Sequence, residues 1–188
     1  MTTRDQIVAA ADELFYQHGF EHTSFTAIAS AVKISRGNFY HHFKSKDEIL
    51  DAVIEARLAS TRQMLEGWES QVAEPEARIQ RFIHILIQNQ TLIMSHGCPV
   101  GTLCMELGKL DHASREHANE LFLLFKRWLA RQFAELGRKK DADALALHLL
   151  GRSQGVATMA QTFRDASFVR REVRLMDQWL QSCASPAA

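Results

Sequence analysis

The amino-acid sequence predicts an all-α protein of about nine helices. Apolar residues recur at spacings of three and four along most of the 188 residues, and no segment alternates between apolar and polar residues as a β-strand does. The chain holds only three prolines and nine glycines, so the helix breaks are few and can be located. Hydrophobic residues make up 46% of the chain, which is enough to form a packed core.

The N-terminal part is predicted to hold one ordinary helix followed by two very short ones. The first helix covers about residues 3–18 and ends at a glycine, and the short helices cover about residues 25–32 and 36–42. Ser24 and Ser35 each stand where a serine caps the start of a helix. Two short helices joined by a tight turn form a helix-turn-helix.

The second short helix has one apolar face and one polar face. Phe39 and Phe43 stand four residues apart and are expected to fix the helix to the core. The opposite face then points outward with residue types that read DNA. Arg36 can bind guanine with two hydrogen bonds, Asn38 can pair with adenine, and Gly37 allows the backbone to come close to the groove.

Positive charge is concentrated around this helix although the whole chain is neutral, with 22 basic and 22 acidic residues. The stretch SRGNFYHHFKSK contains no acidic residue. The residues expected to contact DNA are Thr26, Lys33, Ser35, Arg36, Gly37, Asn38, Tyr40, His41, His42, Lys44 and Lys46. Those assigned to the phosphate backbone rather than to bases are Tyr40, His42, Lys44 and Lys46. Ser45 and Glu48 predict a capping box at the start of the next helix, where a phosphate would meet free N–H groups and the Lys46 ammonium.

Longer helices are predicted from residue 46 onward. One covers about residues 46–68, and breaks follow near Glu74–Pro75 and at residues 95–99, 137–141 and 165–168. Apolar periodicity runs without interruption from Ile79 to Ile93. Further helices are expected at about residues 121–136 and 141–163, followed by a final one.

The segment GFEHTSFTAIASAVKISRGNFYHHFKSKDEIL closely resembles the N-terminal domain of the TetR/AcrR family of bacterial transcriptional regulators. The positions that match the family pattern are Gly19, Phe20, Thr23, Ser24, Ile28, Ala29, Ser35, Gly37, Phe39, Tyr40, His42, Phe43, Lys46 and Ile49 or Leu50. Lys33 departs from the pattern, because the family usually has glycine at that place in the turn. The departure is expected either to strain the turn slightly or to supply one more phosphate contact.

The resemblance implies two domains. Residues 1–62 would form the DNA-binding domain, with the helix-turn-helix at about 24–43, and residues 63–188 would form a ligand-binding and dimerisation domain. It also implies that the last two long helices form a homodimer. Gly151 and Gly155 in a Gly-x-x-x-Gly pattern would let two helices approach closely, and the residues of the final helix assigned to the same interface are Val173, Met176 and Leu180.

The body contains one distinctive stretch, SHGCPVGTLCMELGKLD. It is similar to a Gly-Cys-x-x-Gly-x-Leu-x-x-Glu segment in a subset of the family, some of whose members respond to electrophiles, acrylate-like acids or oxidants. Cys98 is therefore either a reactive thiol or a residue at a bend that shapes a pocket, whereas Cys104 and Cys183 are expected to be buried as small apolar groups. The residues expected to line the ligand pocket are Gln90, Cys98, Trp128 and His148.

Other classes of protein are disfavoured. Three cysteines form no paired pattern, which predicts a reducing compartment and hence the cytoplasm, and no apolar run is long enough to predict a membrane span. No catalytic motif, metal-ligand set or cofactor fingerprint is present, so we expect no enzyme, no metal and no cofactor.

The leading hypothesis is a dimeric repressor that binds a palindromic operator in double-stranded DNA and is released by a small-molecule effector. The alternatives are a repressor that senses oxidants or electrophiles through Cys98, a helical ligand-binding protein without DNA function, and an enzyme.

Overall fold

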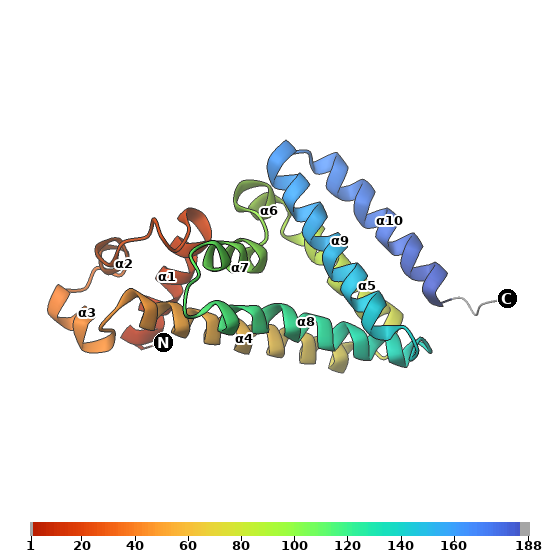
Figure 1. The fold of residues 1–188 in the computed structure, drawn as a ribbon, viewed down its shortest axis with the longest axis horizontal. Coiled ribbons are helices and arrows are strands. Elements are labelled where there is room, and N and C mark those ends of the chain that lie inside the picture. The colour runs from red at the N-terminus through yellow and green to blue at the C-terminus, as the bar shows by residue number, and fades with distance from the viewer. Residues whose placement is uncertain (1, 185–188) are drawn as a thin grey trace. The chain divides into compact units, whose positions relative to one another are not determined.

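The computed structural model describes residues 2–184, with the side chain of Arg36 left out. Among these residues every regular element is an α-helix, which confirms the predicted fold class (Figure 1). In chain order the helices are α1 Thr3–His18, α2 Phe25–Ala31, α3 Arg36–His42, α4 Lys46–Gln71, α5 Pro75–Gln88, α6 Gln90–His96, α7 Pro99–Lys109, α8 Arg115–Glu135, α9 Ala142–Phe163 and α10 Ala166–Ala184. No helix within residues 2–184 is both long enough and apolar enough to cross a membrane.

The chain divides into two compact units. The first unit consists of the described residues up to Thr61 together with Pro99–Leu121, and the second consists of Arg62–Cys98 and the described residues from Phe122 onward. Helices α4 and α8 each run from one unit into the other. The packing of the first unit therefore includes α7 and the start of α8, which lie in the sequence well beyond the predicted DNA-binding domain of residues 1–62. The functional boundary at residue 62 stays a prediction.

The first unit is built around the apolar faces of α1 and α4. Helix α1 begins with a capping box, in which the Thr2 hydroxyl accepts from the Asp5 amide and the Asp5 carboxylate accepts from the Thr2 amide. These bonds hold the pKa of Asp5 below its usual value. Ile7 and Phe15 of α1 are buried, and α1 packs against both α2 and α7.

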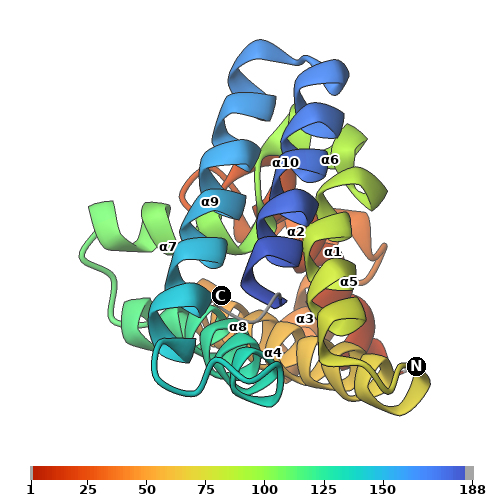
Figure 2. The same ribbon diagram turned by 90° about the vertical axis from the view of Figure 1, so that its right-hand side faces the viewer.

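The second unit has a core to which five long helices contribute. Helix α10 packs along α5, and α6 packs against α9 (Figures 1 and 2). The buried residues of α10 recur every three or four positions and lie in this core; they are Val169, Val173, Met176, Leu180 and Cys183. The side chains of Val173, Met176 and Leu180 were assigned to a dimer interface from the sequence. They are fully enclosed by their own protomer and are not free to contact a partner.

The predicted uninterrupted periodicity from Ile79 to Ile93 is divided in the structure. Helix α5 ends at Gln88 and α6 begins at Gln90, with Asn89 between them at φ −106° and ψ 15°. Asn89 is a poor helix former, and its side-chain amide donates to the Ile85 carbonyl at 3.3 Å. The apolar pattern continues across this kink, so periodicity alone could not reveal it.

A buried polar residue links three helices of the second unit. Gln132 of α8 is 0% exposed, its amide oxygen accepts from Arg78 at 3.0 Å and its amide nitrogen donates to Glu69 at 3.0 Å. Both partners are charged, which makes these hydrogen bonds stronger than those between neutral groups. Gln132 thereby joins α8 to α5 and to the second half of α4.

We expect Gln132→Leu to lower the free energy of unfolding by roughly 1–3 kcal/mol, because Arg78 and Glu69 each lose a buried partner. Urea unfolding followed by circular dichroism measures this loss. Gln161→Leu, at an exposed position on α9 of the same unit, is the control and should stay within about 0.5 kcal/mol of the original protein. Equal stabilities for the two variants would show that the Gln132 hydrogen bonds contribute nothing.

Candidate nucleic-acid interface

Two serines begin the helices of the helix-turn-helix as predicted. The Ser24 hydroxyl accepts from the Ala27 amide at 3.0 Å, and the Ser35 hydroxyl accepts from the Asn38 amide at 3.3 Å. Each bond satisfies an N–H group that the first turn of a helix leaves without a backbone partner. The starts of α2 and α3 are thus both marked in the sequence by a serine that acts as an N-cap.

The turn between these helices requires a left-handed backbone at Lys33. Its φ is 55°, a region that a residue with a Cβ atom enters only at a cost. The family pattern has glycine here, and the geometry explains why. Lys33 therefore carries backbone strain. Because its side chain is exposed, it also presents a positive charge beside the turn.

Helix α3 is fixed by aromatic side chains on its inner face. Phe39 is 0% exposed and Phe43 is 2% exposed. The ring of Phe25 meets that of Phe39 edge to face, with centroids 4.5 Å apart, and lies 5.0 Å from the ring of Tyr40. These contacts set the rotation of α3 about its axis and hence which residues face outward.

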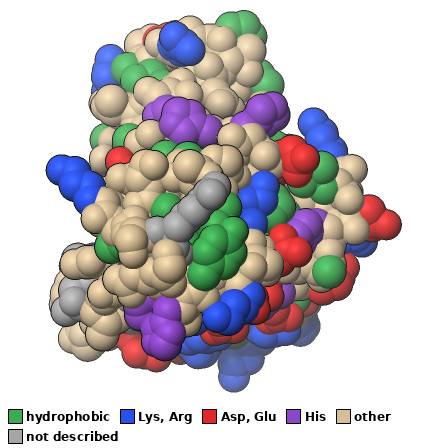
Figure 3. All heavy atoms as spheres, turned by 90° about the vertical axis from the view of Figure 1, so that its left-hand side faces the viewer, with side chains coloured by type: hydrophobic (Ala, Val, Ile, Leu, Met, Phe, Trp, Pro, Cys, Tyr) green, Lys and Arg blue, Asp and Glu red, His purple; other side chains and the backbone are tan. Residues whose placement is uncertain are grey.

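The outward face of α3 carries the residues predicted to read DNA. Gly37, Asn38, Tyr40 and His41 are exposed there, and a Cβ atom added at Gly37 would meet nothing within 4 Å. Arg36 is also predicted to contact DNA from this helix, but its side chain lies outside the described part of the chain. Figure 3 shows the face on which α3 lies, where basic and histidine side chains are spread over the surface and most acidic ones gather toward the lower right.

Other predicted contact residues border this face. Thr26, Ser35 and Lys44 are exposed, and His42 is half-buried. The imidazole rings of His41 and His42 meet edge to face at 5.4 Å. The structure therefore brings the predicted DNA-contacting residues that it describes to one connected region of the first unit.

Two of the lysines in this region are tethered to the backbone. The Lys44 ammonium donates to the Tyr40 carbonyl at 2.6 Å. The Lys46 ammonium donates to the Phe20 carbonyl at 2.9 Å and lies 4.2 Å from the centre of the Phe20 ring. Lys46 was assigned to DNA from the sequence, and the structure shows that it also holds the turn between α1 and α2.

The start of α4 differs in one respect from the expected capping box. The Ser45 hydroxyl accepts from the Glu48 amide at 3.1 Å, as predicted. The Glu48 carboxylate, however, accepts from the Lys44 amide at 2.7 Å rather than from Ser45. The carboxylate reaches one residue further back, so it ties the segment between α3 and α4 to the first turn of α4.

The residues predicted to line a ligand pocket all belong to the second unit, but they differ in burial. Trp128 is 3% exposed, and its ring meets that of Trp68 at 5.7 Å. Gln90 and Cys98 are half-buried. His148 is exposed and packs against the ring of Trp179 at 4.9 Å, so it lies on the surface of this unit rather than in its core.

Both other cysteines were predicted to be buried, and this prediction is correct for Cys183 but not for Cys104. Cys183 is buried, and this burial raises the pKa of its thiol, which opposes reactivity. Cys104 is half-buried and donates to the Ala118 carbonyl at 3.4 Å. A reactive role for Cys98 stays a prediction.

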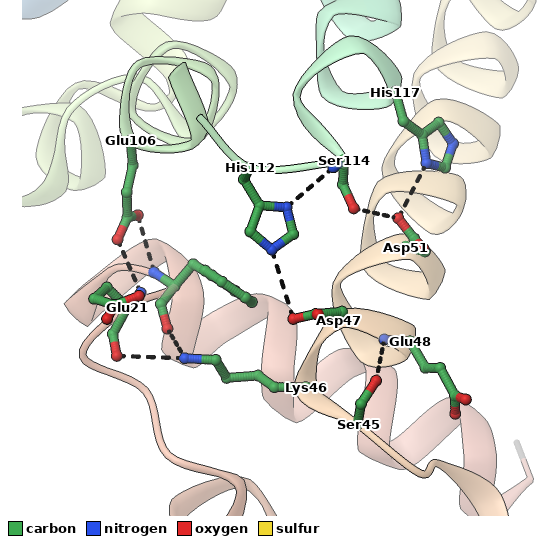
Figure 4. Close-up of polar contacts among 11 residues, drawn as sticks. Glu21, Ser45, Lys46, Asp47, Glu48, Asp51, Glu106, His112, Ser114 and His117 are labelled. Atoms are coloured by element: carbon green, nitrogen blue, oxygen red, sulfur yellow. Dashed lines mark hydrogen bonds and ion pairs between the residues drawn. The ribbon is translucent and has the colours of Figure 1, made fainter. Parts of the chain in front are cut away.

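One residue beside the interface was not predicted at all. The Glu106 carboxylate of α7 accepts from the backbone amides of Phe20 and Glu21 at 2.9 Å each (Figure 4). Eighty-six positions separate Glu106 from Phe20, so no local sequence signal links them. Gly19, with φ 87°, was the available hint, because such a glycine often marks a place where another group approaches the backbone closely.

Comparison with known proteins places this helix-turn-helix in a family. The model of the family described as "Bacterial regulatory proteins, tetR family" matches residues 7–53. An uncharacterised HTH-type transcriptional regulator from the lacX 3′ region of Lactococcus lactis subsp. lactis is 26% identical over 178 residues, which cover 93% of this chain and 91% of that protein. The chain is a member of the TetR family.

Two further similarities extend over most of this TetR-family protein. The HTH-type transcriptional repressor DhaR of Mycobacterium sp. (strain GP1) is 23% identical, over 81% of this chain and 79% of that repressor. A crystal structure of a TetR transcriptional regulator from Legionella pneumophila superposes with a TM-score of 0.84 at 22% identity, over 95% of this chain and 97% of that one. The relatives are regulators of transcription, and this TetR-family protein is a DNA-binding transcriptional regulator.

We expect Lys33→Gly to raise the free energy of unfolding by about 0.5–1 kcal/mol. The left-handed conformation of Lys33 costs about 1–2 kcal/mol, and part of this gain is offset by the greater freedom of glycine in the unfolded chain. Lys33→Ala is the matched control, because it removes the charge and keeps the strained φ. If the two variants unfold at the same urea concentration, the strain at Lys33 is negligible.

Proposed function

We propose that this TetR-family regulator is a repressor that binds a two-fold symmetric operator as a homodimer and is released by a small molecule. The exposed polar face of α3 is the observation that carries this proposal. The helix presents Asn38, Tyr40 and His41 to the outside while Phe39 and Phe43 anchor it from behind. A short helix presented in this way fits the major groove, where base edges carry a distinct pattern of donors and acceptors.

The roles of individual residues follow from their chemistry. Asn38 is suited to adenine and Arg36 to guanine, because each can form two hydrogen bonds with that base. Tyr40, with its side chain 46% exposed, and the neighbouring lysines are suited to phosphates. In a symmetric dimer the two α3 helices would enter successive major grooves about 34 Å apart.

An exposed ridge on α9 supports dimer formation through this helix. Leu147, Gly151, Gly155, Met159 and Phe163 follow one another at intervals of four residues, and all five are exposed. Rows of residues four apart form the ridges by which helices most often pack against each other. Three of the five are large and apolar, with Phe163 69% exposed, and such a row on a surface indicates an interaction site.

The two glycines of the ridge strengthen this interpretation. A Cβ atom at Gly151 or Gly155 would meet nothing within 4 Å in the protomer. Their small size therefore does not serve packing inside the protomer. It would serve close approach of an α9 helix from a second copy, in a two-fold interface where each ridge meets its own counterpart.

Two unpaired polar atoms in the second unit support the binding of a small molecule there. Among the described residues, neither the Trp128 ring nitrogen nor the Gln90 amide oxygen has a hydrogen-bond partner, although both atoms are buried. Buried polar groups in native proteins are nearly always paired. An effector that supplies an acceptor to Trp128 and a donor to Gln90 would complete both.

The experiment that tests this function is selection of bound fragments from genomic DNA with the purified protein. We expect recovered fragments to share a palindromic sequence and to protect two half-sites in a footprint. The variant Asn38→Ala, prepared in the same way, is the negative control. Recovery of unrelated fragments by both proteins would refute sequence-specific binding.

Asn38→Ala should weaken binding to the selected operator by roughly 1–3 kcal/mol and leave binding to random DNA almost unchanged, because it removes a contact to a base. Lys33→Ala should weaken binding to both DNAs alike and make the plot of log K against log salt shallower by about one unit. Fluorescence anisotropy at several salt concentrations measures both effects. The same loss pattern for the two variants would contradict these roles.

Gly155→Leu should convert the dimer to a monomer and reduce operator affinity roughly 100-fold or more, because the two DNA-binding domains would no longer be linked. Gly155 is exposed, a Cβ atom there would meet nothing within 4 Å in the protomer, and leucine favours the helix by about 1 kcal/mol over glycine, so we expect the variant to fold. Gly67→Leu is the control, since Gly67 is also a helical glycine with open space around it. Sedimentation equilibrium gives the mass, and a dimeric Gly155→Leu protein with normal affinity would place the interface elsewhere.

A further inference from the structure

The backbone of the turn between α1 and α2 is held from two sides by charged side chains from distant parts of the sequence. Glu106 of α7 accepts from the amides of Phe20 and Glu21, and Lys46 of α4 donates to the carbonyls of the same two residues, at 2.9 and 3.4 Å (Figure 4). Four backbone groups of two adjacent residues are thus bound by one carboxylate and one ammonium. Hydrogen bonds to charged groups are about twice as strong as neutral ones.

The turn is shaped to admit the carboxylate. Gly19 has φ 87°, and a Cβ atom placed there would come within 2.9 Å of one Glu106 oxygen and 3.2 Å of the other. Any larger residue at position 19 would be strained by its own backbone and would also push Glu106 away. The glycine therefore allows two N–H groups and a carboxylate to meet at close range.

The ring of Phe20 occupies the centre of this arrangement. It is 3% exposed and lies edge to face with Phe15 at 5.3 Å and with His112 at 5.0 Å, while the Lys46 ammonium lies over it. His112 comes from the segment between α7 and α8. Phe20 is thus in contact, through its backbone or its ring, with α1, α4, α7 and the segment that follows α7.

Further polar contacts join α4 to the start of α8 and to the segment before it. The Ser114 hydroxyl donates to Asp51 at 2.8 Å, and His117 lies 3.4 Å from the same carboxylate (Figure 4). The other ring nitrogen of His117 lies 2.7 Å from Glu55. His112 lies 3.5 Å from Asp47, and its other ring nitrogen accepts from the Ser114 amide at 3.0 Å. All of these residues belong to the first unit.

We propose that Glu106 is a positioning residue that makes α7 move as one body with the helix-turn-helix. We call the contacts of Glu106 and Lys46 with Phe20 and Glu21 the turn latch. The proposal rests on the proposed function, since it identifies the part of the regulator through which α7 affects DNA binding. Helix α7 begins at Pro99, directly after the first segment of the second unit ends at Cys98, so a displacement of that junction reaches α2 and α3 through the turn latch.

The first test uses the free protein and the variant Glu106→Gln. Glutamine keeps one carbonyl oxygen but places an NH2 group against the second backbone N–H, so at least one bond is lost. Hydrogen exchange measured by NMR should become about tenfold faster at the Phe20 and Glu21 amides and should also rise in α2 and α3. Lys46→Met, which keeps a side chain over the Phe20 ring, should produce the same pattern from the other side.

The matched control is Glu116→Gln. This exposed carboxylate in the first turn of α8 pairs with the adjacent Arg115 and is not part of the turn latch. Exchange in α2 and α3 should be unchanged in this variant. If Glu106→Gln speeds exchange only at Phe20 and Glu21, Glu106 has a local structural role and the proposal is wrong.

The second test adds the selected operator fragment and measures exchange in α7. Because coupling between two sites is reciprocal, DNA bound at α3 must change α7 if α7 affects DNA binding. We expect a change of about fivefold or more in α7 amides of the original protein and almost none in Glu106→Gln.

The outcomes of the second test separate the two proposals. DNA binding with no response in α7 of the original protein would overturn the coupling and leave the proposed function intact. An equal response in the Glu106→Gln variant would remove Glu106 from the coupling. Failure of the original protein to bind any fragment would overturn the proposed function, and the exchange of α2 and α3 in the free variants would still decide whether the turn latch joins them to α7.

Discussion

A helix of seven residues cannot maintain its conformation in water by itself, and α3 is such a helix. Closing the first helical turn costs more conformational entropy than its single hydrogen bond returns, so a short helix persists only through contacts with other elements. In this protein those contacts are the burial of Phe39 and Phe43 and the cap at Ser35. The surface proposed to meet DNA therefore depends on hydrophobic contacts made on the opposite side of the same helix.

The same dependence extends to the turn before the helix-turn-helix. Its amide and carbonyl groups are bound by Glu106 and Lys46, which lie 86 and 26 residues from Phe20 in the sequence. The DNA-binding helices thus belong to a unit that includes α7 and the start of α8. A fragment that ended at residue 62 would lack half of the groups that hold this turn.

Local signals in the sequence predicted the fold and the construction of the helix-turn-helix. Ser24, Ser35 and the pair Phe39 and Phe43 each act within a few residues of their own position, and each was interpreted correctly. The family pattern, which has glycine at the position of Lys33, indicated the left-handed backbone there. Local signals failed at Asn89, where the apolar spacing continues through a kink.

Contacts between distant residues could not be predicted in this way. Nothing near Glu106 indicates that its carboxylate reaches the backbone of Phe20. The apolar row of Val173, Met176 and Leu180 has the same spacing whether it faces the core of its own protomer or a second copy. Only the packing of α10 on α5 decides between these two arrangements.

The tethering of Lys44 and Lys46 has a consequence for how this protein would sense DNA shape. A lysine on a free stem can follow a phosphate over several ångströms, so it contributes equally on all DNA. An ammonium held by a carbonyl oxygen, as at Tyr40 and Phe20, needs the phosphate at one position. The spacing of phosphates varies with groove width and bending, which depend on base sequence. These two lysines would therefore make recognition sensitive to base pairs that no side chain of α3 touches.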